Sequence, residues 1–226
     1  MGNLIEQLRS EPALSYKLAV NILGHAPASV EALDAVHDVL NAKLVWSLLS
    51  ERGADGRIPF HPYKKWNGAH WVFSILADLG YPALPASPLS AMMEDVYDWL
   101  LGQSHAKHIR TLQGRVRRCA SQEGYAIWYS LRLGLADGRT QELAERLMKW
   151  QWPDGGWNCD KHPQADSSSF METLIPLRAL ALYAQASGDR RARRSAERAA
   201  EIFLVRHLFK RRRDGQVMDP HFVRLH

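Results

Sequence analysis

The sequence predicts an all-α protein, and three observations support this prediction. Apolar residues recur at helical spacings of three and four almost throughout the chain, and no segment shows a convincing strand-like alternation. Residues that cap helix N-termini precede these periodic segments, and glycines follow several of them. With boundaries good to about two to four residues, the expected helices cover 13–23, 29–52, 67–79, 90–103, 121–133, 140–152, 169–187 and 190–209.

The ends of these helices carry start and stop signals in chain order. For the first expected helix, 13–23, apolar periodicity is the only signal. Short polar side chains that accept hydrogen bonds from free backbone N–H groups stand at the next starts: Ser29, Asn67, Ser90, Ser121, Thr140 and Ser169. Glycines, which adopt the left-handed conformation at little cost, stand after four ends: Gly53, Gly80, Gly134 and Gly188. The segment from Ser169 to Glu172 also matches a capping box, in which the carboxylate bonds back to the cap residue.

The composition is that of a folded globular protein. The chain has 226 residues, 46% of them hydrophobic and 23% charged, which excludes disorder and favours a single domain over 1–226. No stretch approaches the roughly 20 apolar residues of a membrane helix, and the start of the chain lacks a signal-peptide core. We therefore expect a cytoplasmic protein without a transmembrane segment, in which Cys119 and Cys159 are free thiols or metal ligands.

The positive net charge is concentrated in one segment. Residues 190–213 contain ten Arg or Lys and two Glu, although the whole chain carries only +5. Apolar residues recur at helical spacing within this segment, so the arginines should decorate the outer face of an amphipathic helix. Aromatic residues do not alternate with the basic ones, which argues against a single-stranded nucleic-acid partner. A solvated outer face is the favoured interpretation.

Long and short connections alternate along the chain, and the long ones repeat a polar turn. The long connections are 53–66, 104–120, 153–168 and the segment from 210 onward. In a chain of antiparallel helices, every second connection lies at the same end, so one face should collect the long loops and carry function. The period is about 50 residues, one helical hairpin each, which indicates a solenoid or a closed ring of hairpins.

The segment Gln151-Trp-Pro-Asp-Gly-Gly-Trp157 resembles the QW motif of squalene-hopene cyclases and related terpenoid cyclases. The resemblance is strong over about 140–187 and weak in the other repeats. It implies the α/α-toroid fold that these enzymes share with protein prenyltransferase β subunits. It also implies a bracing role for Gln151 and Trp157, which in the family tie a helix end to the next hairpin.

The chain departs from the cyclase pattern in two respects. No Asp-x-Asp-Asp acid motif is present, which argues against conventional polyene cyclisation and leaves open whether the chain is an enzyme. The pairs Asp34/Asp38 and Asp95/Asp98 have helical spacing and are expected on exposed faces. The last segment also has no following helix, so we expect an incomplete ring that lacks its C-terminal completion.

The third long loop contains the densest group of ligand-type side chains, Cys159, Asp160 and His162. Cys, Asp and His are the residue types by which the similar prenyltransferases hold catalytic zinc, so zinc is the candidate cofactor, although no cofactor remains the simpler expectation. Cys119 occupies a similar place in the second loop and could converge with them. The alternative is a structural loop, in which Cys159 packs inward and Asp160 accepts backbone hydrogen bonds in a turn.

A second group lies near the starts of the helices that follow the long loops. If the chain is an enzyme, His70, Glu123 and Asp160 are the acid/base candidates, with Arg115 or Arg117 holding an anionic group. Each has a structural alternative. Glu172, a further binding candidate, is explained by a capping box, and Glu123 by compensation of the helix dipole. The histidine could equally be a buried hydrogen-bonded side chain.

Tryptophans gather near the same face, where they could line a ligand cavity or simply fill the core. The candidates for ligand contact are Trp66, Trp71, Trp128 and Trp157. Together with the resemblance, they predict a hydrophobic small-molecule ligand, with isoprenoids as the candidate class. Two alternatives stay open: a zinc-dependent enzyme that is prenyltransferase-like or hydrolytic, and a non-catalytic helical-repeat scaffold for a protein or an acidic partner. Peripheral membrane contact and oligomeric state are undetermined by the sequence.

Overall fold

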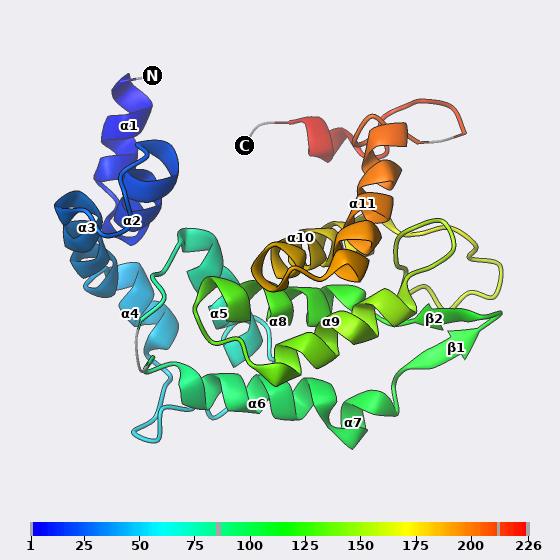
Figure 1. The fold of residues 1–226 in the computed structure, drawn as a ribbon, viewed down its shortest axis with the longest axis horizontal. Coiled ribbons are helices and arrows are strands. Elements are labelled where there is room, and N and C mark those ends of the chain that lie inside the picture. Colours follow the sequence, from blue (N-terminus) through cyan, green and yellow to red (C-terminus); the bar gives the residue numbers. More distant parts are fainter. Residues whose placement is uncertain (1, 85–86, 212, 225–226) are drawn as a thin grey trace. The chain divides into compact units, whose positions relative to one another are not determined.

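The computed structural model describes residues 2–84, 87–211 and 213–224 and is mostly helical (Figure 1). The helical class is confirmed, whereas the ring arrangement of an α/α-toroid stays a prediction. The α-helices are α1 (Gly2–Arg9), α2 (Ser15–Lys17), α3 (Val30–Leu40), α4 (Lys43–Leu49), α5 (Ala69–Leu79), α6 (Ser90–Leu101), α7 (Gln103–Ala106), α8 (Ala120–Arg132), α9 (Gly138–Trp150), α10 (Phe170–Ser187) and α11 (Arg190–Val205). Shorter elements are the 3₁₀ turns Pro12–Leu14 and Pro220–Val223, the π-helical turn Leu18–Ile22, and the strands β1 (Arg110–Leu112) and β2 (Arg115–Arg117).

The chain folds into two compact units. Unit 1 comprises 1–105 and 128–140, and unit 2 comprises 106–127 and 141–226. The helices α8 and α9 each contribute residues to both units. The expectation of a single toroid-like domain over the whole chain therefore stays a prediction. Within the described residues, no helix combines the length and the apolar character that crossing a membrane requires.

The helix expected over 29–52 is two helices, α3 and α4. The first ends at Leu40 and is capped by Asn41, whose backbone N–H and Nδ2 both donate to the carbonyl of His37, at 3.1 and 2.9 Å. In α4, Leu44 and Trp46 are exposed. The apolar spacing continues across the break, which is why periodicity alone does not reveal it. No periodic pattern predicts α1 either.

Several cap assignments need correction by one to three residues. Ser29 and Ser169 cap their helices through the side chain, as predicted. The helices α5 and α6 instead follow Gly68 and Leu89, and Ser121 lies inside α8. Thr140 lies inside α9, buried, with Oγ1 2.7 Å from the Tyr97 hydroxyl, because Asp137 accepts the free backbone N–H of Arg139 and occupies the cap position. The left-handed glycines at 80, 134 and 188 are confirmed, whereas Gly53 lies beyond the end of α4 and is not left-handed.

The polar turn of the second long connection, at Gln113-Gly114, joins two strands, so the prediction of no strand is wrong at this place. The strands β1 and β2 pair antiparallel, with Leu112 opposite Arg115. Gln113 and Gly114 both have positive φ, 50° and 69°, as a two-residue type I′ hairpin turn requires. Each strand has only three residues, too few for an alternating pattern to register.

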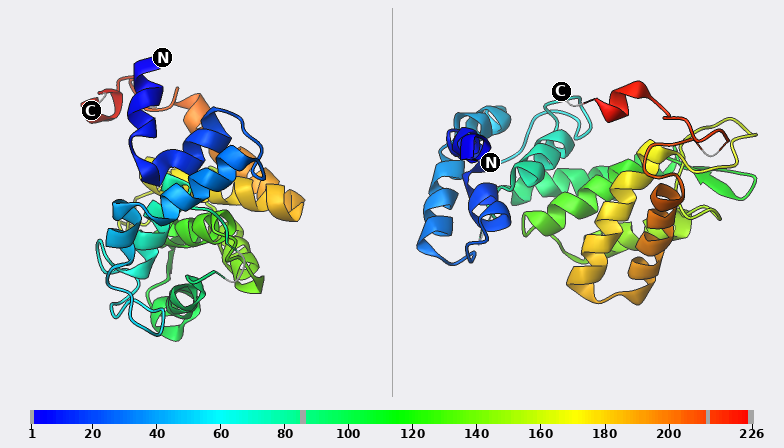
Figure 2. Two further views of the ribbon diagram at one scale, coloured as in Figure 1. Left: turned by 90° about the vertical axis from the view of Figure 1, so that its left-hand side faces the viewer. Right: turned by 90° about the horizontal axis from the view of Figure 1, so that it is seen from above.

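The helices α10 and α11 form an antiparallel pair in unit 2 (Figure 2). They are joined by Gly188 and by Asp189, whose carboxylate accepts the first free N–H groups of α11. The apolar face of α11 is buried as predicted, through Ala192, Ala196, Ala199, Ile202 and Phe203. The helix ends at Val205 rather than near 209, because His207 and Leu208 adopt positive φ and leave the helical path.

Candidate functional site

The candidate site lies in unit 2, where three segments meet. The strand β2 ends at Arg117, which forms an isolated parallel bridge with Asn158. This pairing places the residues that follow each partner side by side. Cys119 comes two residues after the first partner, directly before α8, and Cys159 comes one residue after the second. The bridge therefore brings together two cysteines that are distant in sequence.

The loop that carries Cys159 is closed at its base. The carboxylate of Asp154 accepts hydrogen bonds from Ser168 N at 2.7 Å and from Ser168 Oγ at 2.6 Å. The backbone N–H of Ser169 donates to the carbonyl of Trp157 at 2.8 Å. Gly155, with φ 102°, passes so close to α11 that a Cβ there would lie 2.6 Å from the Arg198 carbonyl oxygen. These contacts hold the start of the loop against α10 and α11 and so position Cys159.

Glu172 in the first turn of α10 completes the cluster. A capping box would direct its carboxylate to the backbone N–H of Ser169, but that N–H already bonds to the Trp157 carbonyl. Only the serine half of the box forms, with Ser169 Oγ accepting from Glu172 N at 3.4 Å. The glutamate side chain turns instead to α8, where Oε2 accepts from Ser121 N at 3.1 Å. Its other oxygen remains for the cysteines.

Cys119, Cys159 and Glu172 each offer one ligand atom, and these atoms all lie within 4.8 Å of one another. Cys159 Sγ lies 3.7 Å from Glu172 Oε1, within hydrogen-bond distance for sulfur. All three residues are half-buried, and both thiols are free. We call this set the Cys-Cys-Glu cluster. Since the atoms around a tetrahedral zinc ion with Zn–S distances of about 2.3 Å lie roughly 3.5–4 Å apart, only small side-chain movements separate this geometry from a ligand set.

The electrostatics of the cluster make the two thiols unequal. The pKa of Cys119 is lowered, first because its sulfur accepts a hydrogen bond from Cys159 and also because of the Arg118 guanidinium. Burial and the negative charges of Glu172 and Glu123 act against this shift. The pKa of Cys159 is raised because its thiol donates that hydrogen bond, with burial and the glutamate charge adding to the effect. Cys119 is therefore the first thiol to become a thiolate.

Glu123 lies in α8 near this cluster and is fully buried. Its Oε1 is 3.8 Å from Arg146 Nη1 on α9, so a buried ion pair joins the two helices within unit 2. The side chain was expected either to transfer protons or to compensate the dipole of α8. Its position in the interior, with an arginine beside it, supports a structural role in holding α8 and α9 together. Its negative charge also acts on Cys119 of the cluster.

Asp160 and His162, expected beside Cys159 as metal ligands, do not join the cluster. Both are exposed and form consecutive turns, with Asp160 Oδ1 accepting from His162 N at 2.9 Å and His162 Nδ1 accepting from Gln164 N at 3.3 Å. This is the structural alternative that the sequence left open for Asp160. Neighbouring side chains in such a turn diverge, so only Cys159 of the expected trio faces Cys119 and Glu172.

Arg117, expected to hold an anionic group, is buried against tryptophan. Only 1% of the residue is exposed, its Cζ lies 4.4 Å from the centre of the Trp152 ring, and its Nη1 donates to the Asp160 carbonyl. Arg115 lies on the same ring at 5.6 Å and is half-buried. The indole N–H of Trp152 donates in turn to Val116 between them. These contacts fix the hairpin to unit 2 and favour bracing over ligand contact.

His70, the expected proton carrier, is buried in unit 1. Its Nδ1 lies 3.1 Å from the Tyr129 hydroxyl, and rings of Tyr63, Trp71 and Trp99 surround it at centroid distances between 5.3 and 5.4 Å. Burial lowers its pKa to about 3, so the side chain is neutral at physiological pH. This environment matches the buried, hydrogen-bonded alternative that the sequence left open for His70. Glu123 and Asp160, its expected partners, belong to unit 2.

The candidate tryptophans have different environments. Trp157 is buried in unit 2, and its Nε1 donates to the Leu147 carbonyl in α9 at 3.0 Å. In unit 1, Trp66 is 64% exposed and packs edge-on against Trp71 at a centroid distance of 4.6 Å. Trp128 is half-buried, with the Arg132 guanidinium 5.6 Å from its ring. Of these, Trp66 offers the largest free ring surface.

Gln151 shows the bracing expected of it. Its Nε2 donates to the carbonyl of Gly155 at 2.7 Å and to the carbonyl of Ser195 in α11 at 2.8 Å. Together with Trp157 it ties the end of α9 to the following loop and to the last helical pair. These contacts are structural and take no part in the Cys-Cys-Glu cluster.

No family model matches the chain, and neither a curated protein nor a solved structure matches it significantly.

Proposed function

We propose that this chain is a zinc protein whose ion is held by the Cys-Cys-Glu cluster. The observation behind the proposal is the approach of three ligand atoms, from three separate segments, to within 4.8 Å. Thiolates and carboxylates together suit zinc, which accepts both, whereas magnesium and calcium prefer oxygen alone. The lowered pKa of Cys119 supports metal uptake, because a ligand thiol must lose its proton.

The number of protein ligands supports a catalytic role. Structural zinc sites are usually closed by four protein ligands, whereas catalytic sites have three and keep a position for water or substrate. Cys119, Cys159 and Glu172 supply three. A bound ion would lower the pKa of a water or thiol in the fourth position. The reaction class that we propose is therefore hydrolysis or transfer to a thiol, in line with the zinc-dependent alternative from the sequence.

Elemental mass spectrometry of the purified chain, dialysed without chelator, tests the metal. We expect one zinc ion per chain, lost in the variants Cys119→Ser, Cys159→Ser and Glu172→Gln. The matched controls are Asp160→Asn and His162→Ala, which change exposed residues of the same loop outside the cluster. Full zinc in the cysteine variants would refute the site. Loss of zinc in His162→Ala would restore the ligand set expected from the sequence.

Cobalt substitution tests the open position. In the cobalt-loaded protein, the sulfur-to-metal absorption band should shift when a small thiol such as ethanethiol is added, because the thiol enters the fourth position. Glu172→Gln treated with cobalt in the same way should show a weak or absent band with or without the thiol, because that variant should not retain the ion. An intense spectrum that no added thiol changes would show a closed structural site and would contradict the catalytic part of the proposal.

The hydrophobic-ligand prediction has one specific observation in its favour, the exposed ring of Trp66 beside Trp71. We propose this place in unit 1 as the contact point for an isoprenoid-like ligand. Quenching of tryptophan fluorescence by farnesol should weaken in Trp66→Ala and persist in Trp46→Ala, a control whose tryptophan is 65% exposed. Equal quenching in both variants would remove this proposal. If the zinc test also fails, the scaffold alternative is the one that remains.

A further inference from the structure

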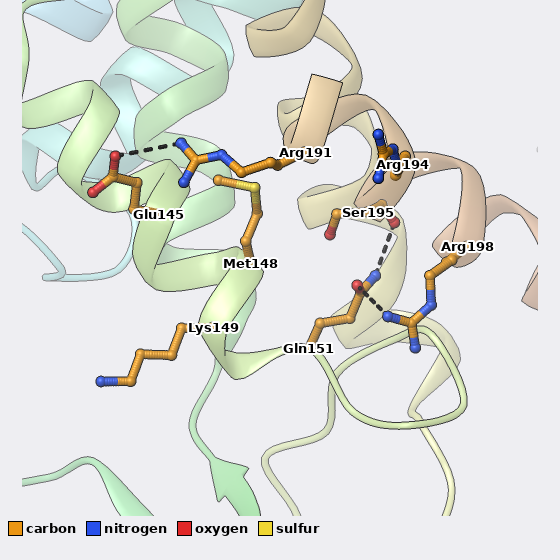
Figure 3. Close-up of a pocket in the computed structure, with 8 residues that line it drawn as sticks. All are labelled: Glu145, Met148, Lys149, Gln151, Arg191, Arg194, Ser195 and Arg198. Carbon is orange, nitrogen blue, oxygen red and sulfur yellow. Dashed lines mark hydrogen bonds and ion pairs between the residues drawn. The ribbon is translucent and has the colours of Figure 1, made fainter. Parts of the chain in front are cut away.

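A groove in unit 2 between α9 and α11 has features of a binding site that is separate from the cluster. Its volume is about 530 Å³, and Figure 3 shows the side chains that line it. Four of the lining side chains are cationic, Lys149, Arg191, Arg194 and Arg198, and one, Glu145, is anionic. None of the lining residues is aromatic. The groove is therefore a concave, strongly basic surface without rings for stacking.

The four cations differ in how far their charge is already used. Arg191 Nη2 lies 2.8 Å from Asp189 Oδ2 and 3.7 Å from Glu145 Oε1, so two carboxylates neutralise it. Arg198 donates to Gln151 Oε1 and to the carbonyl of Pro153, so its guanidinium is held by neutral acceptors. Within the described part of the chain, Lys149 and Arg194 have neither a carboxylate nor a hydrogen-bond partner. Both are exposed along the groove.

Ser195 supplies the second, independent observation. It lines the groove, only 6% of the residue is exposed, and its Oγ is buried without a hydrogen-bond partner among the described residues. A serine inside a helix ordinarily donates to the carbonyl one turn earlier. A buried hydroxyl with no partner is unfavourable, so its presence at the wall of a basic groove indicates an acceptor that the protein itself does not supply.

We propose that this groove binds a phosphate monoester. The phosphate oxygens would accept hydrogen bonds from the Ser195 hydroxyl and charge-assisted hydrogen bonds from Arg194 and Lys149. Because Arg191 is paired with two carboxylates, it does not contact the phosphate in this proposal. The positive charge left in the groove is then small enough for one phosphate group to neutralise. The lack of aromatic residues argues against single-stranded nucleic acid, which stacks its bases on rings.

Calorimetric titration with glycerol 3-phosphate tests the proposal, because the helix offers a matched pair of substitutions. Arg194→Gln and Arg193→Gln remove the same charge from adjacent positions of α11. Arg193 lies outside the groove and pairs with Glu197 at 3.0 Å. We expect about tenfold weaker binding in Arg194→Gln, in line with the loss of a charge-assisted hydrogen bond, and less than about twofold weakening in Arg193→Gln, as for a surface charge.

Ser195→Ala tests the buried hydroxyl. Alanine suits a helix, so the variant should fold at least as well as the natural chain, which thermal unfolding checks. Binding of glycerol 3-phosphate should weaken by about fivefold, as for a lost hydrogen bond. Unchanged affinity in both Ser195→Ala and Arg194→Gln would overturn the site. Equal weakening in the two arginine variants would also overturn it, because it would show that only the general charge of the helix attracts the anion.

Vesicles identify the source of the phosphate monoester. Vesicles of phosphatidylcholine with phosphatidic acid present the same group as a lipid headgroup. Binding to these vesicles that is lost in Arg194→Gln but kept in Arg193→Gln, with no response to the soluble ester, assigns a headgroup. The reverse result assigns a free metabolite. An RNA oligonucleotide that binds more tightly than either probe, and equally in both variants, would instead show a general polyanion surface and contradict the proposal.

Discussion

Replacing Gly124 with alanine tests whether the close crossing of α8 and α10 assembles the Cys-Cys-Glu cluster. A Cβ at this position would lie 3.0 Å from Ile175 Cγ2 and 3.0 Å from the backbone nitrogen of Pro176, and a backbone atom cannot rotate away. Overpacking of this kind costs about 1–3 kcal/mol, while the better helix propensity of alanine offsets up to about 1 kcal/mol. We expect a net loss of roughly 1–2 kcal/mol and a Tm lower by about 2–8 °C.

The same substitution should weaken zinc binding. Ser121 and Glu172 lie one helical turn before the crossing on α8 and α10, where their 3.1 Å hydrogen bond joins the helix starts. If the helices separate at the crossing, the carboxylate moves away from Cys119. Competition with a chromophoric zinc chelator measures the resulting loss of affinity, and circular dichroism measures Tm.

A second glycine provides the control for this experiment. Gly138 is the first residue of α9, and a Cβ there would meet nothing within 4 Å. Gly138→Ala should be neutral or stabilising by up to about 1 kcal/mol, with unchanged zinc affinity. A Gly124→Ala variant that is as stable as Gly138→Ala and binds zinc equally well would refute the account of the crossing.

Three further predictions follow from the described contacts. The pKa of His70 is lowered to about 3 by burial, so folding stability should fall by about 1.4 kcal/mol per pH unit as the pH drops from about 6.5 towards 3. Denaturant unfolding across this range should give a shallower dependence of unfolding free energy on pH for His70→Gln, and an unchanged dependence would contradict the burial argument. In metal-free protein, iodoacetamide should label Cys119 before Cys159, because only the pKa of Cys119 is lowered, and bound zinc should protect both thiols. Mass spectrometry measures the order of labelling, and faster labelling of Cys159 would reverse the assignment of the thiolate. Trp157→Phe removes the buried hydrogen bond to the Leu147 carbonyl and should lower the free energy of unfolding by about 1–3 kcal/mol. Trp46→Phe removes an exposed hydrogen bond to the Leu40 carbonyl and should lower it by less than about 0.5 kcal/mol. Similar losses for the two variants in urea unfolding would show that burial of the bond is unimportant.

The helices were predictable because their signals are local. Apolar spacing and the buried face of α11 agree between sequence and structure, as do the caps at Ser29 and Ser169. The failures occur where a single contact overrides the pattern. Asn41 caps the end of α3 through its bonds to the His37 carbonyl, which apolar spacing does not register. The hairpin at Gln113-Gly114 is too short to alternate.

The candidate site was predictable only in part. The sequence singled out Cys159 and noted that Cys119 could converge with it, but it assigned Asp160 and His162 as the other ligands. Glu172 was known as a candidate but explained by a capping box. The capping pattern is satisfied by Ser169 alone, since the Trp157 carbonyl takes the backbone N–H that the carboxylate would need. The sequence carries no signal that Glu172 lies beside the two cysteines, because Ser121 and Glu172 meet only through the crossing of their helices.

The helical class, most helix positions and the buried and exposed faces of α11 could be read from the sequence alone, and the resemblance to the QW motif implied the bracing role of Gln151 and Trp157. Each of these depends on residues within a few turns of one another or on a contiguous motif. Three properties become visible only in the folded chain: which carboxylate neighbours the two cysteines, that His70 is buried and neutral, and that Ser195 lines a basic groove. Those properties depend on distances and burial between segments far apart in the chain, which no local spacing encodes.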